Sequence, residues 1–177
     1  NNDGSDSNNR LTIDVDTIRP TIAISSDFLS LKAGETATIT FTLSESSSDF
    51  DASVVTVSGG SLSSFSGSNT TYTATFTPTA NSTTNGVISV ASEQFSDAAG
   101  NTNNDGSDVN NTLTITVDTI RPTIAILSNV SSLKAGETAV ILFTLSESIN
   151  FIENDITVSG GALSNFFGLD TSYTATF

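Results

Sequence analysis

Hydrophobic and polar residues alternate along much of this chain with a period of two. In residues 37–43, Ala, Ile, Phe and Leu take every second position, and Thr fills the positions between them. The same alternation runs through residues 72–76 and 113–117. A period of two is that of a β-strand with one buried face, and β-branched Thr suits the solvent-facing side of a pleated surface. The pattern predicts strands in these three segments.

Shorter apolar pairs predict further strands, with turn residues between them. These pairs are Ile22 and Ile24, Val55 and Val57, Leu62 and Phe65, and Ile88 and Val90. Gly59-Gly60 and Asn85-Gly86 are turn signals. About seven short strands in about 100 residues predict an all-β fold, an immunoglobulin-like β-sandwich. The sequence has no Cys and no Trp, so we expect other aromatic residues to fill the core: Phe41, Phe65, Tyr72, Phe76 and Phe95.

The chain also repeats itself. Residues 16–24 read DTIRPTIAI and recur as residues 118–126, and the LKAGET of residues 31–36 recurs as residues 133–138. Near-copies in one sequence indicate a tandem array. The predicted division is a C-terminal strand of a preceding repeat (1–16), a complete repeat (17–118) and the N-terminal part of a further, truncated repeat (119–177).

Composition narrows the chemistry. Five Lys and Arg against 19 Asp and Glu give a net charge of −14, which argues against nucleic acid and against anionic membrane surfaces as partners. With no His and no Cys, imidazole and thiol catalysis and His- or Cys-based zinc sites are excluded. Oxygen ligands remain, and these favour hard cations such as calcium. No apolar run approaches the roughly 20 residues of a membrane span.

Acidic residues gather where consecutive repeats would meet. We expect Asp16 to face Glu45 and the 97–108 loop across one junction. Asp118 occupies the same position in the following repeat, so we expect it to face Glu147, Glu153 and Asp155 across the second junction. Carboxylates this close repel one another unless a cation intervenes, and calcium accepts about six to eight oxygens. The predicted calcium ligands are Asp16, Glu45, Asp97, Asn101, Asp105, Asp108, Asp118, Glu147 and Asp155. The alternative is that these acids are solvated turn residues.

Several of these motifs, in this order, resemble bacterial immunoglobulin-like repeats. They are the segments Val15–Ile24, Leu31–Thr36, Phe41–Glu45, Thr56–Gly60, Tyr72–Pro78 and Asp97–Asn101. Such repeats build the long extender arrays of giant secreted adhesins, including those of the calcium-dependent RTX type. The resemblance implies a sandwich fold, an extracellular or cell-surface location and calcium between repeats.

The expected function is that of a structural spacer rather than an enzyme. Its partners would be the adjacent repeats of the same chain. Neighbouring chains, bound through exposed strand edges, are a second class of partner. Two alternatives stay open: a virion or filament module that mediates assembly, and a module that binds glycans or host surfaces. Phe167 stands where the other repeat has Ser66, and we expect its ring to be exposed.

Overall fold

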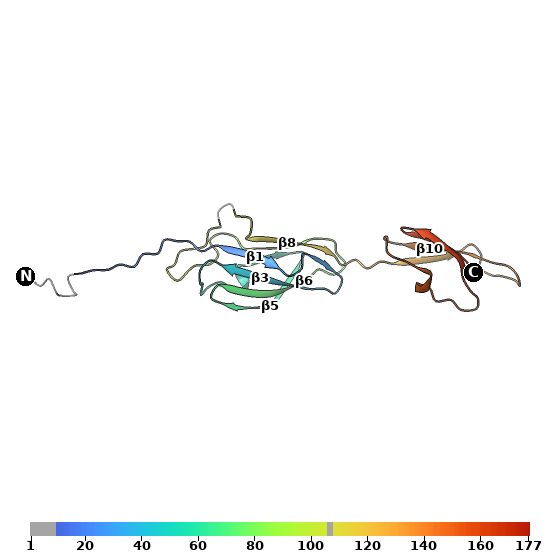
Figure 1. The fold of residues 1–177 in the computed structure, drawn as a ribbon, viewed down its shortest axis with the longest axis horizontal. Coiled ribbons are helices and arrows are strands. Elements are labelled where there is room, and N and C mark those ends of the chain that lie inside the picture. Colours follow the sequence, from blue (N-terminus) through green and yellow to red (C-terminus); the bar gives the residue numbers. More distant parts are fainter. Residues whose placement is uncertain (1–9, 106–107) are drawn as a thin grey trace, which may run out of the picture. The chain divides into compact units, whose positions relative to one another are not determined.

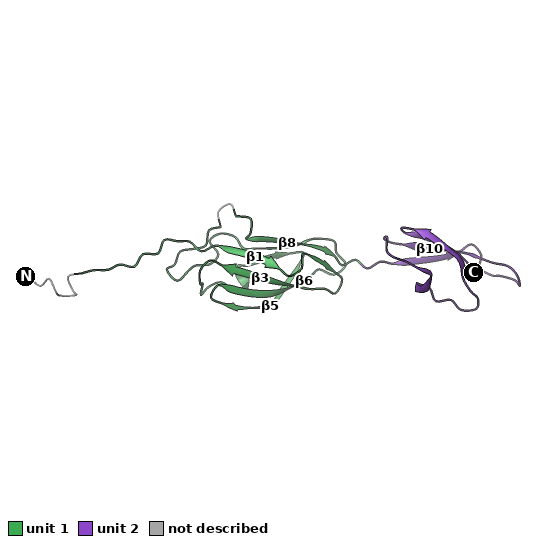
Figure 2. Cartoon of the chain, in the orientation of Figure 1, with its two compact units in different colours: residues 1–120 green, residues 121–177 purple. Residues whose placement is uncertain are grey.

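The computed structural model describes residues 10–105 and 108–177, and it divides the chain into two compact units. Unit 1 spans Asn1–Ile120 and unit 2 spans Arg121–Phe177 (Figure 2). Both are built from β-strands, joined by loops and two short 3₁₀ turns. The predicted all-β, sandwich-type fold is confirmed.

Unit 1 is a sandwich of two four-stranded sheets (Figure 1). The first sheet has the order β1-β3-β6-β5, with β1 Ile22–Ser26, β3 Ala37–Leu43, β6 Thr71–Pro78 and β5 Gly60–Ser68. The second has the order β2-β8-β7-β4, with β2 Ser30–Lys32, β8 Thr112–Asp118, β7 Gly86–Ser89 and β4 Thr56–Ser58. The 3₁₀ turn η2, Ala52–Val54, precedes β4.

The predicted strand at Ile22 and Ile24 is β1, and the chain then forms a further strand, β2, in the opposite sheet. β1 pairs antiparallel with β3, while β2 runs parallel to β8 in the opposite sheet. The chain crosses at residues 27–29, where Asp27 accepts a hydrogen bond from Thr38 N at 2.7 Å. This switch ties both sheets to one continuous segment.

The period of two places the apolar side chains as the sequence predicts. Along β3, Ala37, Ile39, Phe41 and Leu43 are buried, and the threonines between them face outward. Phe41 also joins an aromatic cluster with Phe65 and Tyr72. The ring of Phe50 lies at the centre of this cluster, 5.0 Å from Tyr72 and 5.2 Å from Phe95. Sequence patterning missed Phe50 because it comes from a loop.

Unit 2 repeats the first sheet alone, in the order β11-β12-β10-β9. Its strands are β9 Ile124–Ser128, β10 Val140–Leu145, β11 Ser164–Leu169 and β12 Ser172–Thr176, and the 3₁₀ turn η3 spans Glu153–Asp155. The side of this sheet that matches the core of unit 1 is partly open. Ile124 is 44% exposed, whereas its counterpart Ile22 is 1% exposed.

The last residues of unit 1 pass beyond the boundary predicted at residue 118. Thr119 is buried, and its hydroxyl donates to Thr79 O at 2.7 Å and accepts from Ser82 N at 2.9 Å. Its backbone N–H also bonds Ser82 O. At the other end, residues 1–9 of the predicted tail strand lie outside the described residues, and residues 10–16 carry no strand.

Candidate metal centre

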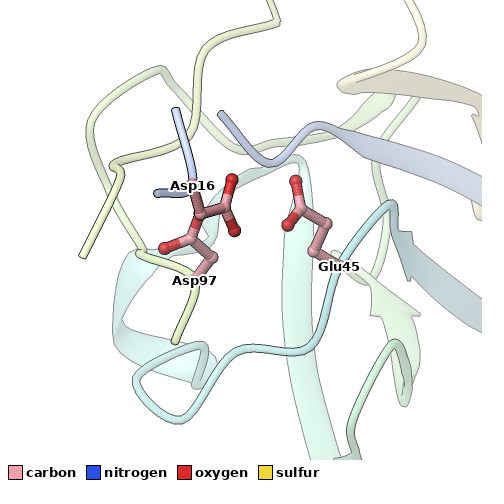
Figure 3. A group of neighbouring side chains, drawn as sticks. All are labelled: Asp16, Glu45 and Asp97. Carbon is pink, nitrogen blue, oxygen red and sulfur yellow. The ribbon is translucent and has the colours of Figure 1, made fainter. Parts of the chain in front are cut away.

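Three carboxylates from distant parts of unit 1 meet at one end of the sandwich. Asp16 precedes β1, Glu45 follows the end of β3, and Asp97 lies in the loop between β7 and β8. One oxygen from each lies within 4.8 Å of the other two. Figure 3 shows the carboxylates of Asp16 and Asp97 side by side, with that of Glu45 turned toward them. We call this group the acidic triad.

The loop from Asp97 to Asn101 is shaped around the Asp97 carboxylate. Oδ1 accepts hydrogen bonds from Ala99 N at 2.9 Å and Asn101 N at 2.8 Å, and Oδ2 accepts one from Asn101 Nδ2 at 2.8 Å. The bond from the Asn101 side chain, opposed by burial and reinforced by the backbone donors, lowers the pKa of Asp97. Asp97 is therefore a fixed anion at neutral pH.

Asn101 also connects this loop to the segment that precedes the sandwich. Its Nδ2 donates to Asp16 O at 3.2 Å. The Asp16 carboxylate meanwhile accepts a hydrogen bond from Ile18 N at 3.0 Å. Asn101, a predicted ligand, thus lies beside the triad and orients two of its members.

The next residues of the same segment are anchored on both sides. Pro20 is fully buried, and its carbonyl accepts a hydrogen bond from Asn104 N at 3.0 Å. Thr21 and Ser44 share two hydrogen bonds. Thr21 N donates to the Ser44 hydroxyl, and Ser44 N donates to Thr21 O. Since Pro fixes its own φ and keeps the preceding residue extended, the path from Asp16 into β1 is narrowly defined.

Glu45 is the electrostatically disfavoured member of the triad. Its Oε1 is buried and has no hydrogen-bond partner. Burial, followed by the charges of Asp16 and Asp97, raises the pKa of Glu45 above its ordinary value of 4.5. A buried acceptor without a donor is costly, and a cation placed among the three oxygens would satisfy it.

The donor set fits calcium. All three side chains offer hard, anionic oxygen, which calcium and magnesium prefer. The residues come from a chain segment and two loops, and calcium tolerates such irregular geometry better than magnesium does. One oxygen from each carboxylate gives three ligands, fewer than the six to eight that calcium takes, so second carboxylate oxygens, water or nearby carbonyls would complete the shell.

Two of the other predicted ligands lie outside the triad. Asp105 is buried and accepts hydrogen bonds from Ile22 N at 2.7 Å and Asn103 Nδ2 at 3.2 Å. It therefore fastens the first residue of β1 to the loop before β8. Asp108 is exposed, and its backbone N–H bonds Asp105 O at 2.9 Å.

The three ligands predicted for the second junction are divided between the units. Asp118 ends β8 in unit 1 and accepts a hydrogen bond from Ile120 N, as Asp16 does from Ile18 N. Glu147, the counterpart of Glu45, is half-buried in unit 2. Asp155 ends η3 and accepts a bond from Ile152 N at 3.0 Å, so it caps a turn.

Two polar residues outside the predicted ligand set support the loops around the triad. Asn103 is fully buried, accepts hydrogen bonds from Gln94 N and Phe95 N, and donates to Ala91 O and Asp105 Oδ2. Asp49 accepts two bonds from Ser96 and so joins the loop after β3 to the loop after β7. Asn and Asp are common in turns, so nothing in the sequence pattern marks the buried Asn103 or the exposed Asp49 as a link between loops.

Comparison with known proteins gives the family. No curated protein matches the chain. No described helix is long and apolar enough to cross a membrane. The model of one family, described as a bacterial Ig-like domain, matches residues 16–115 and again residues 118–177. The two matches begin at the aspartates Asp16 and Asp118, and together they cover most of the sequence. The chain therefore belongs to the bacterial Ig-like domain family.

Proposed function

We propose that this chain is a non-catalytic spacer of an extracellular bacterial surface protein, and that calcium bound by the acidic triad stiffens it between repeats. Several features support a spacer. The sequence carries near-copies in tandem, and an array of copies extends a protein without needing a unique site in each. Membership in the bacterial Ig-like domain family supports a structural module.

The acidic triad supplies the means of stiffening. Asp16 comes from the segment that leads into the sandwich, whereas Glu45 and Asp97 belong to the sandwich itself. A cation held by all three ties this segment to the loops that follow β3 and β7. Together with the buried Pro20, it limits bending at the point where one repeat would follow another.

One observation carries the calcium proposal: Glu45 Oε1 is buried, unpartnered and turned toward two other carboxylates. An acid that only served solubility would gain nothing from this position, because its charge is disfavoured there. Extracellular calcium modules have dissociation constants of roughly 10⁻⁴–10⁻³ M. A site of this kind would fill outside the cell and empty in a chelator.

Isothermal titration with calcium tests the proposal. We expect one site in unit 1 of the whole chain, and we expect Glu45→Gln to abolish it. Glu93→Gln is the matched control, because Glu93 is an exposed glutamate of the same unit outside the triad. Equal binding by the wild type and Glu45→Gln would refute the triad as the site.

A further inference from the structure

A row of apolar side chains crosses the outer face of the sheet in unit 2. Leu127 of β9 pairs with Leu142 of β10, Leu142 pairs with Thr174 of β12, and Thr174 pairs with Phe167 of β11. Directly paired residues of a sheet point to the same side. The row therefore spans all four strands, and we call it the outer row.

The face that carries the row is the one opposite the core. On β10 the core side is marked by Phe143, whose ring packs against Phe151 and Phe166. Leu142 alternates with Phe143 and so faces outward. On β11 the register shifts between Ser164 and Phe167, which leaves Phe166 inward and Phe167 outward.

Unit 1 shows that a complete sandwich leaves this face open to solvent. The equivalent row there is Ser25, Thr40, Thr73 and Ser66, joined by the same pairings. Ser25 and Ser66 are exposed although both sheets of unit 1 are present. A second sheet packed on the core side of unit 2 would therefore not cover the outer row.

The row is apolar only in unit 2. Ser25, Thr40 and Ser66 are replaced by Leu127, Leu142 and Phe167. Leu127 is 62% exposed and Phe167 is 77% exposed. The neighbouring Val140 and Leu169, exposed at 49% and 74%, replace Thr38 and Ser68 and extend the patch. Together these side chains expose on the order of 400 Å² of apolar surface, a patch size that is often functional.

From this surface we infer that unit 2 binds a second copy of itself, outer row against outer row. Charge argues for this occupant. β9, β10, β11 and β12 contain no Asp, Glu, Lys or Arg, while the whole chain carries a net charge of −14. Two such anionic chains repel each other least where both faces are uncharged, and a basic partner would find no carboxylate in these strands.

The geometry of the row suits a two-fold contact. Two sheets can pack face to face about 10 Å apart with their strands nearly aligned. A two-fold axis midway along the row, between Thr174 and Leu142, would place Phe167 of one copy against Leu127 of the other, since these residues stand at opposite ends of the row. The patch is about half of the roughly 800 Å² per partner that a standard interface buries, so one contact is weak. Copies along two arrays would add to one another.

Analytical ultracentrifugation of the whole chain in EDTA tests the inference, and the chelator keeps it separate from the calcium proposal. We expect a concentration-dependent dimer. The triple variant Leu127→Ser, Leu142→Thr and Phe167→Ser installs the residues of unit 1 and should raise the dimer dissociation constant about tenfold or more. Adding Ser25→Leu, Thr40→Leu and Ser66→Phe to that variant moves the row to unit 1 and should restore the dimer.

A second variant separates the outer row from the open core side of unit 2. Ile124→Thr with Ile126→Thr changes the core side alone and should leave the dimer intact. The single variant Phe167→Ser, at a well-exposed position, covers the case in which the triple variant does not fold. A chain that stays monomeric, a dimer unaffected by Phe167→Ser, or a dimer lost only in the core-side variant would overturn the inference. Binding of glycans without self-association would overturn it as well.

Discussion

The carboxylate of Asp16, from the segment that precedes the sandwich, lies within 4.8 Å of the carboxylate of Glu45, which follows β3. Neither residue belongs to a strand. They meet because Pro20 and Thr21 are fastened between Asn104 and Ser44, so the segment leading into β1 passes over the end of β3. Asp97 completes the group from a third loop.

The raised pKa of Glu45 should make the free energy of unfolding depend on pH. Its folded-state pKa is raised above 4.5, so its contribution to stability is complete below pH 4.5 and is lost as the pH rises through the raised value. In EDTA we expect Glu45→Gln to remove this decline and to be more stable than the wild type at pH 7. Thermal unfolding from pH 4 to pH 8 measures the difference. Parallel profiles for the two proteins would contradict the account.

The lowered pKa of Asp97 should have the opposite effect on the pH dependence of stability. Its pKa is lowered from 3.8, so its hydrogen bonds stabilise the fold above pH 3.8, and that stability is lost as the pH falls through the lowered value. Asp97→Asn should therefore flatten the acid limb of the stability curve. A variant that lost stability equally at pH 3 and pH 7 would show that the Asp97 charge is irrelevant.

Asn103 should be among the most sensitive polar positions in unit 1. Its side chain satisfies Gln94 N, Phe95 N, Ala91 O and Asp105 Oδ2 in a fully buried site. Asn103→Ala leaves several buried groups unpaired and should lower the free energy of unfolding by about 3 kcal/mol or more. The exposed Asn85→Ala should change it by less than about 0.5 kcal/mol. Urea unfolding measures both.

The sequence pattern predicted the main strands of unit 1, but it did not predict their connections, and it predicted a tail strand where residues 10–16 carry none. Alternation predicted β3, β6 and β8, because their buried faces impose a period of two. It gave no sign that Phe50 would sit among the core rings, since a loop residue has no periodicity. It also gave no sign of β2, whose parallel pairing with β8 in the opposite sheet depends on contacts that only the folded chain makes.

Substitution of Thr119 tests whether the residues after β8 stabilise unit 1. Its hydroxyl bonds Thr79 O and Ser82 N in a buried site, so Thr119→Val should destabilise unit 1 by about 1–3 kcal/mol. Its repeat counterpart Thr17 is exposed, and Thr17→Val should have little effect. Chemical denaturation of both variants provides the comparison. Equal effects would show that the residues after β8 contribute nothing to unit 1.

The spacing of acidic residues along the sequence does not predict which way each side chain points, as Asp97 and Asp105 show. The sequence places Asp97 and Asp105 in one loop, and both carboxylates are buried in the structure. Asp97 turns toward Asp16 and Glu45, whereas Asp105 turns inward to Ile22 N and Asn103. The direction of each side chain follows from the hydrogen bonds of the folded loop, which no periodic pattern records.

Thermal unfolding of the whole chain in calcium and in EDTA, for the wild type and Asp16→Asn, tests the central claim most directly. Calcium at 100 times its dissociation constant should stabilise the wild type by about 2.7 kcal/mol and raise the melting temperature of unit 1 by several degrees. Asp16→Asn should show a much smaller rise, because it removes the ligand that the preceding segment supplies. No rise in the wild type, or an equal rise in Asp16→Asn, would contradict a calcium ion that joins this segment to the sandwich.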